Sequence, residues 1–182
     1  MSCVLTRSSF AAMDLIIETE AADQLSPQRK AILDAMFQRE FGNDPLTYAR
    51  PQWYVVGILQ TRLIACVGVL KRVIEVDGEP LRVGGITGVV TEPEYRGRGI
   101  ASTLVARAVH FMREELKLPL ALLTCKPRLG PFYEKLGWQT VEEPTIFAQA
   151  DGPRTVRGLT MVVESGSARW PEGLIDLQGL PW

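Results

Sequence analysis

The chain has 182 residues, of which 46% are hydrophobic and 23% are charged, and this composition is typical of one globular domain with a sizeable core. Its 20 basic and 21 acidic residues give a net charge of −1, without the basic excess of proteins that bind nucleic acid. Cys3, Cys66 and Cys125 form no CxxC pair, so we expect neither a disulfide framework nor a zinc or other metal site.

No targeting or membrane-spanning segment is recognisable in the sequence. The first 15 residues, MSCVLTRSSFAAMDL, lack the apolar core of a signal peptide. No apolar run reaches the length that a bilayer requires. We therefore expect a cytoplasmic protein without a membrane partner.

The first elements are a short strand and a helix. Asp14–Glu18 predicts the strand. Ser26 and Pro27 predict the start of the helix, because serine caps helices well and proline suits the first helical position. The helix is expected to end at Phe41, and the stretch up to Gln52 predicts a loop or a second short helix.

A block of strands follows, in which β-branched and apolar residues are frequent. The pair Asp77-Gly78 favours a type I′ hairpin turn within this block. Gly84, Gly85 and Gly88 lie inside the last strand, where glycines often mark a bulge or a close approach of another chain segment. The expected strands are Trp53–Leu59, Leu63–Val76 and Leu81–Thr91.

The second half of the chain alternates helices and strands, and its first helix has a clear apolar face at the helical period. The tail 164–182 is rich in glycine and proline. This order of elements predicts an α/β (α+β) fold over 1–182, with a mixed, mostly antiparallel sheet flanked by helices in a single domain. The expected elements are the helices Gly99–Leu116 and Gly130–Leu136 and the strands Leu120–Thr124, Trp138–Val141 and Leu159–Val163.

The stretch Arg96–Ala101 reads Arg-Gly-Arg-Gly-Ile-Ala between a strand and a helix. A helix N-terminus offers free N–H groups and a positive dipole, and glycines let the backbone approach an anion closely. The P-loop pattern is absent, and the dinucleotide fingerprint is only half matched because Ser102 replaces its third glycine. The loop therefore predicts a pyrophosphate site of another kind.

These residues resemble the GCN5-related N-acetyltransferases. Arg96–Ala101 is similar to the family's phosphate loop, Q/R-x-x-G-x-G/A, and Phe132–Trp138 is similar to its second signature, F-Y-x-K-L-G-F. The resemblance covers Val83–Val141 and implies the family's fold. It also implies a direct, ternary-complex transfer of an acetyl group from the cosubstrate acetyl-CoA to a primary amine of a small molecule.

The resemblance assigns roles to individual positions. The backbone of Val89 and Thr91 is expected to bind the acyl carbonyl and the pantetheine arm, and Tyr133 is expected to protonate the departing thiolate. Many family members have an asparagine before the second signature, whereas this chain reads Thr124-Cys125-Lys126 there. The expected cofactor-binding residues are Val89, Thr91, Arg96, Gly97, Arg98, Gly99, Ile100 and Ala101.

A finer resemblance favours an amino-sugar acceptor. The hairpin Val73–Val83, the position of Tyr133 and a tail ending in tryptophan are similar to the aminoglycoside 2′-N-acetyltransferases. Ala49-Arg50-Pro51 and Trp170–Gly173 look similar to segments of the nodulation N-acyltransferases. Both groups modify amino-sugars.

The same resemblance suggests acceptor-binding residues. The terminal carboxylate of Trp182, Asp44 and Asp176 are the acidic candidates, and Thr87 stands where the aminoglycoside enzymes place a glutamate base. Trp182 also suits an anchor of the tail on the core, Asp44 suits a turn, and Asp176 suits a solvated surface charge.

Two other functions and an assembly stay open from the sequence. One function is acetylation of a peptide or protein amine, and the other is a non-catalytic acyl-CoA sensor. Pairing of the tail or of the strands in Trp53–Val76 would give a homodimer.

Overall fold

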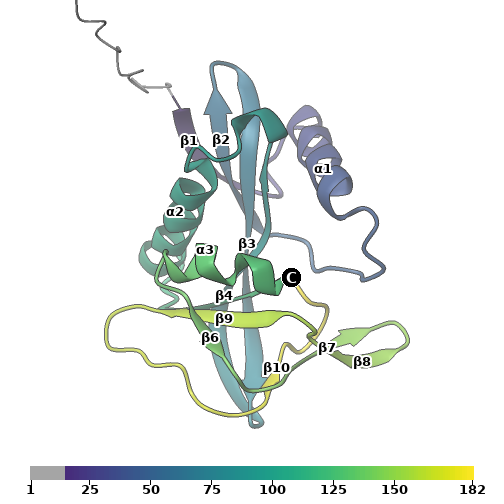
Figure 1. The fold of residues 1–182 in the computed structure, drawn as a ribbon, viewed down its shortest axis with the longest axis vertical. Coiled ribbons are helices and arrows are strands. Elements are labelled where there is room, and N and C mark those ends of the chain that lie inside the picture. The colour runs from purple at the N-terminus through teal and green to yellow at the C-terminus, as the bar shows by residue number, and fades with distance from the viewer. Residues whose placement is uncertain (1–14) are drawn as a thin grey trace, which may run out of the picture.

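The computed structural model describes residues 15–182, so Cys3 and Asp14 lie outside its described range. Figure 1 shows a long, curved sheet with a helix on each side of its upper half. The helices are α1 (Pro27–Phe41), α2 (Ile100–Glu114) and α3 (Gly130–Glu134), with short 3-10 turns at Pro93–Tyr95 and Pro127–Leu129. The strands are β1 (Leu15–Ala21), β2 (Trp53–Leu59), β3 (Arg62–Val76), β4 (Glu79–Thr91), β5 (Leu120–Cys125), β6 (Gln139–Val141), β7 (Thr145–Gln149), β8 (Gly152–Thr155), β9 (Leu159–Glu164) and β10 (Ile175–Asp176).

The described strands form one mixed sheet in the order β6-β9-β5-β4-β3-β10-β7-β8, and β2 joins β3 and carries β1. Within residues 15–182, the pairs β4–β5 and β10–β7 are parallel, and the other pairs are antiparallel. This architecture confirms the predicted mixed, mostly antiparallel sheet flanked by helices in a single domain.

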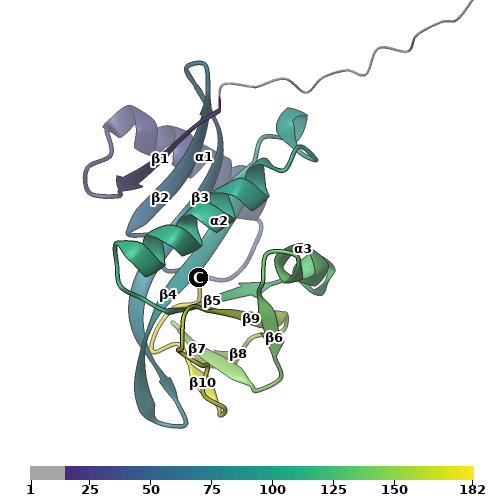
Figure 2. The same cartoon turned by 90° about the vertical axis from the view of Figure 1, so that its left-hand side faces the viewer.

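Helices α1 and α2 cover opposite faces of the sheet (Figures 1 and 2). The stripe predicted for α2 is buried, and its Leu104 and Phe111 pack in the cluster that contains Val55 and Val67. On the other face, α1 buries Leu33 and Met36 in a second cluster with strand residues of β2 to β4. None of the helices in the described part of the chain is long and apolar enough to cross a bilayer.

The ends of the two long helices follow from local chemistry. Ser26 Oγ accepts a hydrogen bond from Arg29 N at 3.2 Å, as expected for a cap, and α1 ends at Phe41 as predicted. Helix α2 ends at Glu114, before the predicted Leu116. The chain turns there because Lys117 adopts a left-handed φ of 55°, so the helix ends before it reaches Pro119.

The turn predicted at Asp77-Gly78 is present, since both residues have positive φ values, 50° and 83°. The hairpin β7–β8 and the short β10 were not expected from the sequence. Pro153 within β8 argues against a strand. The two residues of β10 are a strand only because they pair with β3 and β7.

Candidate active site

Strand β4 contains a bulge at the point where the sequence predicted an irregular strand. Cys66 pairs with Val90 and Gly68 pairs with Thr87, so β4 has one residue more than β3 across this interval. Gly88 adopts a φ of 52°, which a residue with a side chain rarely tolerates. The bulge leaves Gly88 and Val89 without partners in the β3–β4 register.

Strands β4 and β5 separate next to this bulge. Their parallel register consists of Gly84 with Ala121 and Gly85 with Leu122, and it ends there although β4 continues to Thr91. The backbone of β4 between Ile86 and Val89 therefore has an edge that is not paired with β5. An extended ligand can pair with such an edge as an added strand does.

The N-terminus of α2 lies directly after β4 and has free backbone donors. Its cap residue is Gly99, with a φ of 77°, and no side chain caps the first turn. A Cβ placed on Gly97 or Gly99 meets no atom within 4 Å, so space is open above both glycines. The fifteen-residue helix α2 thus presents its positive end to open space, as an anion site requires.

The two arginines of this loop hold its shape. Arg96 Nε donates to the Thr91 carbonyl at 2.9 Å, and its Nη2 lies 2.8 Å from Glu40 Oε2 of α1. Arg98 Nη2 donates to the Glu94 carbonyl at 3.0 Å. The Arg96 guanidinium therefore holds the loop against β4 and α1, and the backbone amides of the loop are the groups suited to bind an anion.

A second ion pair joins α1 to the same place. Glu92 is buried, and its Oε1 lies 2.5 Å from Nη2 of Arg39. Next to Glu92 in sequence, the Thr91 hydroxyl is buried and has no hydrogen-bond partner in the described structure. Helix α1 is thus tied to the loop on both sides of Pro93.

Tyr133 lies in α3 and is 6% exposed. Its ring packs edge-on against Phe132 and Trp138, with centroids 4.8 Å and 6.2 Å away. Burial raises the pKa of Tyr133 above its ordinary value, and the neighbouring Cys125 raises it further. The hydroxyl is therefore protonated at neutral pH and available as a proton donor.

Cys125 lies at the end of β5 beside Tyr133. Burial raises the pKa of its thiol to about 11. A protonated thiol is a poor nucleophile, so Cys125 suits packing better than covalent catalysis.

The far end of the chain reaches the separation of β4 and β5. Trp182 is 3% exposed, its Nε1 donates to the Leu122 carbonyl at 3.2 Å, and its backbone oxygen accepts from Thr124 Oγ1 at 3.1 Å. A Cβ on Gly85 would lie 2.4 Å from Trp182 Nε1. Figures 1 and 2 both place this end of the chain beside β4.

Thr87 lies on β4 between Gly85, which contacts Trp182, and the bulge at Gly88. It is two residues from Gly85, so the two positions point to the same face of the strand. Its Cγ2 would be 2.8 Å from a Cβ on Gly68, and Pro51 occupies the same place. A hydroxyl, and no carboxylate, thus stands at the position where the aminoglycoside enzymes have a base.

Comparison with known protein families identifies the chain. A family model described as an acetyltransferase (GNAT) domain matches residues 19–141, well over half of the 182 residues. The chain belongs to the GNAT acetyltransferase family. The predicted family and enzyme class are therefore confirmed.

Solved structures show the same fold. Escherichia coli YhbS in complex with CoA is 17% identical with a TM-score of 0.64, over 93% of this chain and 96% of that one. Escherichia coli ElaA is 16% identical with a TM-score of 0.63, over 82% and 99%. A GNAT acetyltransferase from Brucella melitensis in complex with acetyl-CoA is 14% identical with a TM-score of 0.57, over 88% and 94%.

The two aspartates suggested as acceptor ligands bond locally in this GNAT chain. Asp44 Oδ1 accepts from Leu46 N at 3.0 Å, and Asp176 Oδ1 accepts from Gln178 N at 2.8 Å. Both are turns in which an aspartate binds the backbone two residues further on. Asp44 Oδ2 also accepts from the Tyr48 hydroxyl at 2.9 Å.

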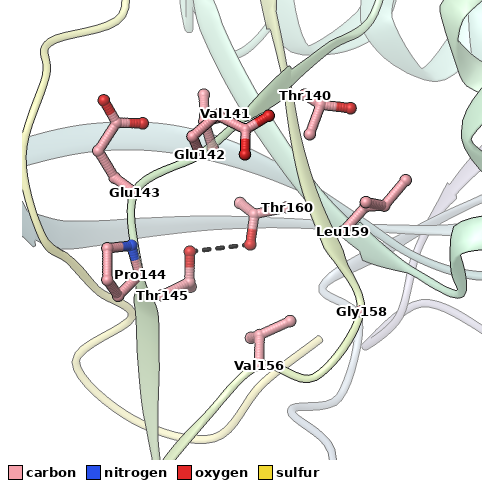
Figure 3. A pocket seen from close by; sticks show the side chains of 10 residues that line it. All are labelled: Thr140, Val141, Glu142, Glu143, Pro144, Thr145, Val156, Gly158, Leu159 and Thr160. Carbon is pink, nitrogen blue, oxygen red and sulfur yellow. Dashed lines mark hydrogen bonds between the residues drawn. The ribbon is translucent and has the colours of Figure 1, made fainter.

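Figure 3 shows a hollow beside β9 that the sequence did not suggest. Thr160 donates to Thr145 at 2.8 Å within it, and Glu142 and Glu143 line it from one side (Figure 3). Two hydroxyls have two protons and this bond uses one, so one threonine can still donate to a ligand. Thr160 pairs with Thr124 of β5, and the Thr124 hydroxyl donates to Trp182 O, so this pair of strands links the hollow to the chain end.

Sequence reasoning also missed Phe37 and Glu40 of α1. Phe37 packs on Gly88, and Glu40 binds Arg96. The glycine at position 88 did signal a close approach, but it could not name the approaching residue, which lies in a helix far away in sequence.

Proposed function

We propose that this GNAT protein transfers an acetyl group from acetyl-CoA to a primary amine of a small amino-sugar or aminoglycoside-like compound. The observation that carries the proposal is the uncapped N-terminus of α2 beside the unpaired edge of β4. The helix N-terminus suits a pyrophosphate, and the unpaired strand edge suits a peptide-like arm such as pantetheine. The CoA and acetyl-CoA bound to YhbS and to the Brucella enzyme support the choice of cosubstrate.

The proposed chemistry divides between backbone and side chain. The amine nitrogen attacks the thioester carbonyl, and the backbone N–H of Val89, a bulge residue outside the β3–β4 register, stabilises the developing oxyanion. The carbon–sulfur bond then breaks, and the Tyr133 hydroxyl gives its proton to the thiolate. The proton lost by the new amide nitrogen restores the tyrosine through solvent, so the products are the amide and CoA.

The amine has no carboxylate base at position 87. Thr87 cannot accept a proton at neutral pH, so the amine must arrive neutral or lose its proton through water to a more distant carboxylate. We therefore expect turnover to rise with pH until the free amine is fully deprotonated. Tyr133 sets no limit in this range, because its raised pKa keeps it protonated.

The surroundings of Trp182 support a hydroxylated, cationic acceptor. The tail 164–182 is held beside the site, since Ala49 N donates to the Pro181 carbonyl at 2.7 Å. The Trp182 indole itself is buried, and the Arg72 guanidinium lies 4.8 Å from its ring centroid, so this side chain anchors the tail beside the site. Beyond Trp182, the hollow offers a threonine hydroxyl for sugar oxygens and Glu142 and Glu143 for additional ammonium groups.

A non-catalytic acyl-CoA sensor is the second candidate, and the absence of a base at Thr87 is the observation that favours it. Against it, the chain has a tyrosine hydroxyl at position 133, where the family resemblance places the acid of an enzyme. Acetylation of a peptide amine is the third candidate.

The proposal is tested by CoA release from acetyl-CoA with four classes of amine: aminoglycosides, glucosamine oligomers, polyamines and short peptides. We expect the highest kcat/KM with the amino-sugars and an increase in KM when Glu142 and Glu143 are both changed to Gln. A higher kcat/KM with peptides would show that the acceptor is a peptide amine and would refute the amino-sugar proposal. Binding of acetyl-CoA without turnover of any amine would favour the sensor.

A further inference from the structure

We infer that Phe37 determines the length of the acyl group, so that the site accepts acetyl-CoA and excludes longer acyl-CoA esters. This inference rests on the proposed function, because it requires the thioester to lie at the bulge of β4. It goes further by naming the side chain that closes the acyl end of the site.

Phe37 lies directly on the bulge. A Cβ built on Gly88 would be 1.9 Å from Phe37 Cε1 and 2.2 Å from Cζ, so the edge of the ring rests on the glycine backbone. Gly88 is followed by Val89, whose N–H is the proposed partner of the acyl carbonyl. The ring therefore occupies the space beside the acyl group on the α1 face of the sheet.

The ring is held in place by its neighbours. Its centroid is 6.0 Å from that of Phe41 and 6.2 Å from that of Tyr54, which meets it edge-on. Phe37 also packs against the buried cluster that contains Leu33 and Met36 of the same helix. A rotation away from Gly88 would cost these contacts, because packed side chains sit in defined rotamers.

Helix α1 itself is fixed relative to the bulge. Arg39, two residues after Phe37, binds the buried Glu92, and Glu40 binds Arg96 at 2.8 Å. Both partners belong to the segment that continues β4 into the cofactor loop. A longer acyl chain therefore cannot push the ring aside by moving the helix without breaking two ion pairs.

Two other sides of the bulge are occupied as well. Val89 packs towards the α2 face, against the large core cluster. Towards the start of β4, Trp182 lies against Gly85. With the thioester carbonyl at Val89, each methylene beyond the acetyl group must displace Phe37 or enter the space that the acceptor needs.

The test measures binding and turnover of CoA, acetyl-CoA, butyryl-CoA and hexanoyl-CoA. The variants are Phe37→Ala, which removes the ring, and Phe37→Leu, which keeps much of the packing if the alanine variant unfolds. Ile32→Ala is the control, because Ile32 is an exposed apolar residue of the same helix and is not among the atoms nearest to a Cβ on Gly88. Calorimetry measures the affinity for each acyl-CoA ester without an acceptor, so its result does not depend on which amine is the substrate.

We expect wild-type protein to bind butyryl-CoA at least about tenfold more weakly than acetyl-CoA, the discrimination that a tight apolar pocket gives. Phe37→Ala should abolish this ratio in both binding and kcat/KM, Phe37→Leu should reduce it, and Ile32→Ala should leave it unchanged. Equal affinity of the wild-type protein for all three esters, or a ratio that survives in Phe37→Ala, would overturn the inference. Failure to bind CoA itself would instead refute the proposed function.

Discussion

Replacement of Gly88 by alanine should destabilise the protein through two separable effects. The first is backbone strain: Gly88 has a φ of 52°, and an L-residue in this region costs about 1–2 kcal/mol. The second is overpacking, because the new methyl group would lie 1.9 Å from Phe37 Cε1, and a forced shift in a packed core costs about 1–3 kcal/mol. We expect the free energy of unfolding to fall by about 2–5 kcal/mol, a large share of the stability of a typical domain.

Urea unfolding of four proteins separates the two effects: wild type, Gly88→Ala, Phe37→Ala and the double variant. Removal of the ring should relieve the overpacking, so the double variant should be more stable than the sum of the single changes by about 1–3 kcal/mol. Gly97→Ala is the matched control. Gly97 has a φ of 73° but nothing within 4 Å of a Cβ, so that change should show the strain alone. Equal losses for Gly88→Ala and Gly97→Ala, or additive losses in the double variant, would refute the contact between ring and bulge.

Three further predictions concern the cofactor side and the core. Tyr133→Phe keeps the ring and removes only the hydroxyl, so kcat should fall by about 100-fold while the calorimetric Kd of acetyl-CoA stays unchanged; an equal loss of binding would contradict the acid role. Gly99 has a left-handed φ of 77°, so Gly99→Asp and the uncharged Gly99→Asn should each lower stability by about 1 kcal/mol, but Gly99→Asp should raise the Kd of acetyl-CoA by at least about tenfold and Gly99→Asn should change it far less. Burial raises the pKa of the Cys66 thiol to about 12, and Glu92 contributes to the increase. The folded protein therefore holds this proton more tightly than the unfolded chain, so the contribution of Cys66 to folding stability is complete below pH 9 and is lost as the pH rises towards 12. Cys66→Ala should therefore remove about 1.4 kcal/mol per pH unit from the slope of stability between pH 9 and 11, and an unchanged slope would place the titration elsewhere.

The glycine loop and the start of α2 could be predicted because their determinants are local. Gly97, Gly99 and the start of α2 form one continuous stretch, and left-handed glycines before a helix have few structural alternatives. The type I′ turn at Asp77-Gly78 was predictable for the same reason. In each case the residue type itself restricts the backbone.

The contacts around α1 and around the chain end join distant segments, which the sequence does not pair. Arg39 and Glu92 are 53 residues apart in sequence, and the Trp182 indole meets a carbonyl 60 residues away. Sequence periodicity predicts which face of a helix is buried, but it does not state which residue lies opposite. Gly85 and Gly88 therefore signalled close approaches whose partners, Trp182 and Phe37, only the fold identifies.

The two aspartates show a related limit. Asp44 and Asp176 were proposed for their charge, yet a carboxylate two residues before a free N–H also closes a turn. Both uses demand the same residue type, so charge alone could not separate them.

The most direct test of the central claim is the stoichiometry of products from acetyl-CoA and the best amine of the panel, measured by mass spectrometry and thiol titration in the same reaction. The account predicts equal amounts of N-acetylated amine and free CoA, formed at a rate that requires the hydroxyl of Tyr133. Release of CoA without an acetylated amine, or tight binding of acetyl-CoA without either product, would contradict it.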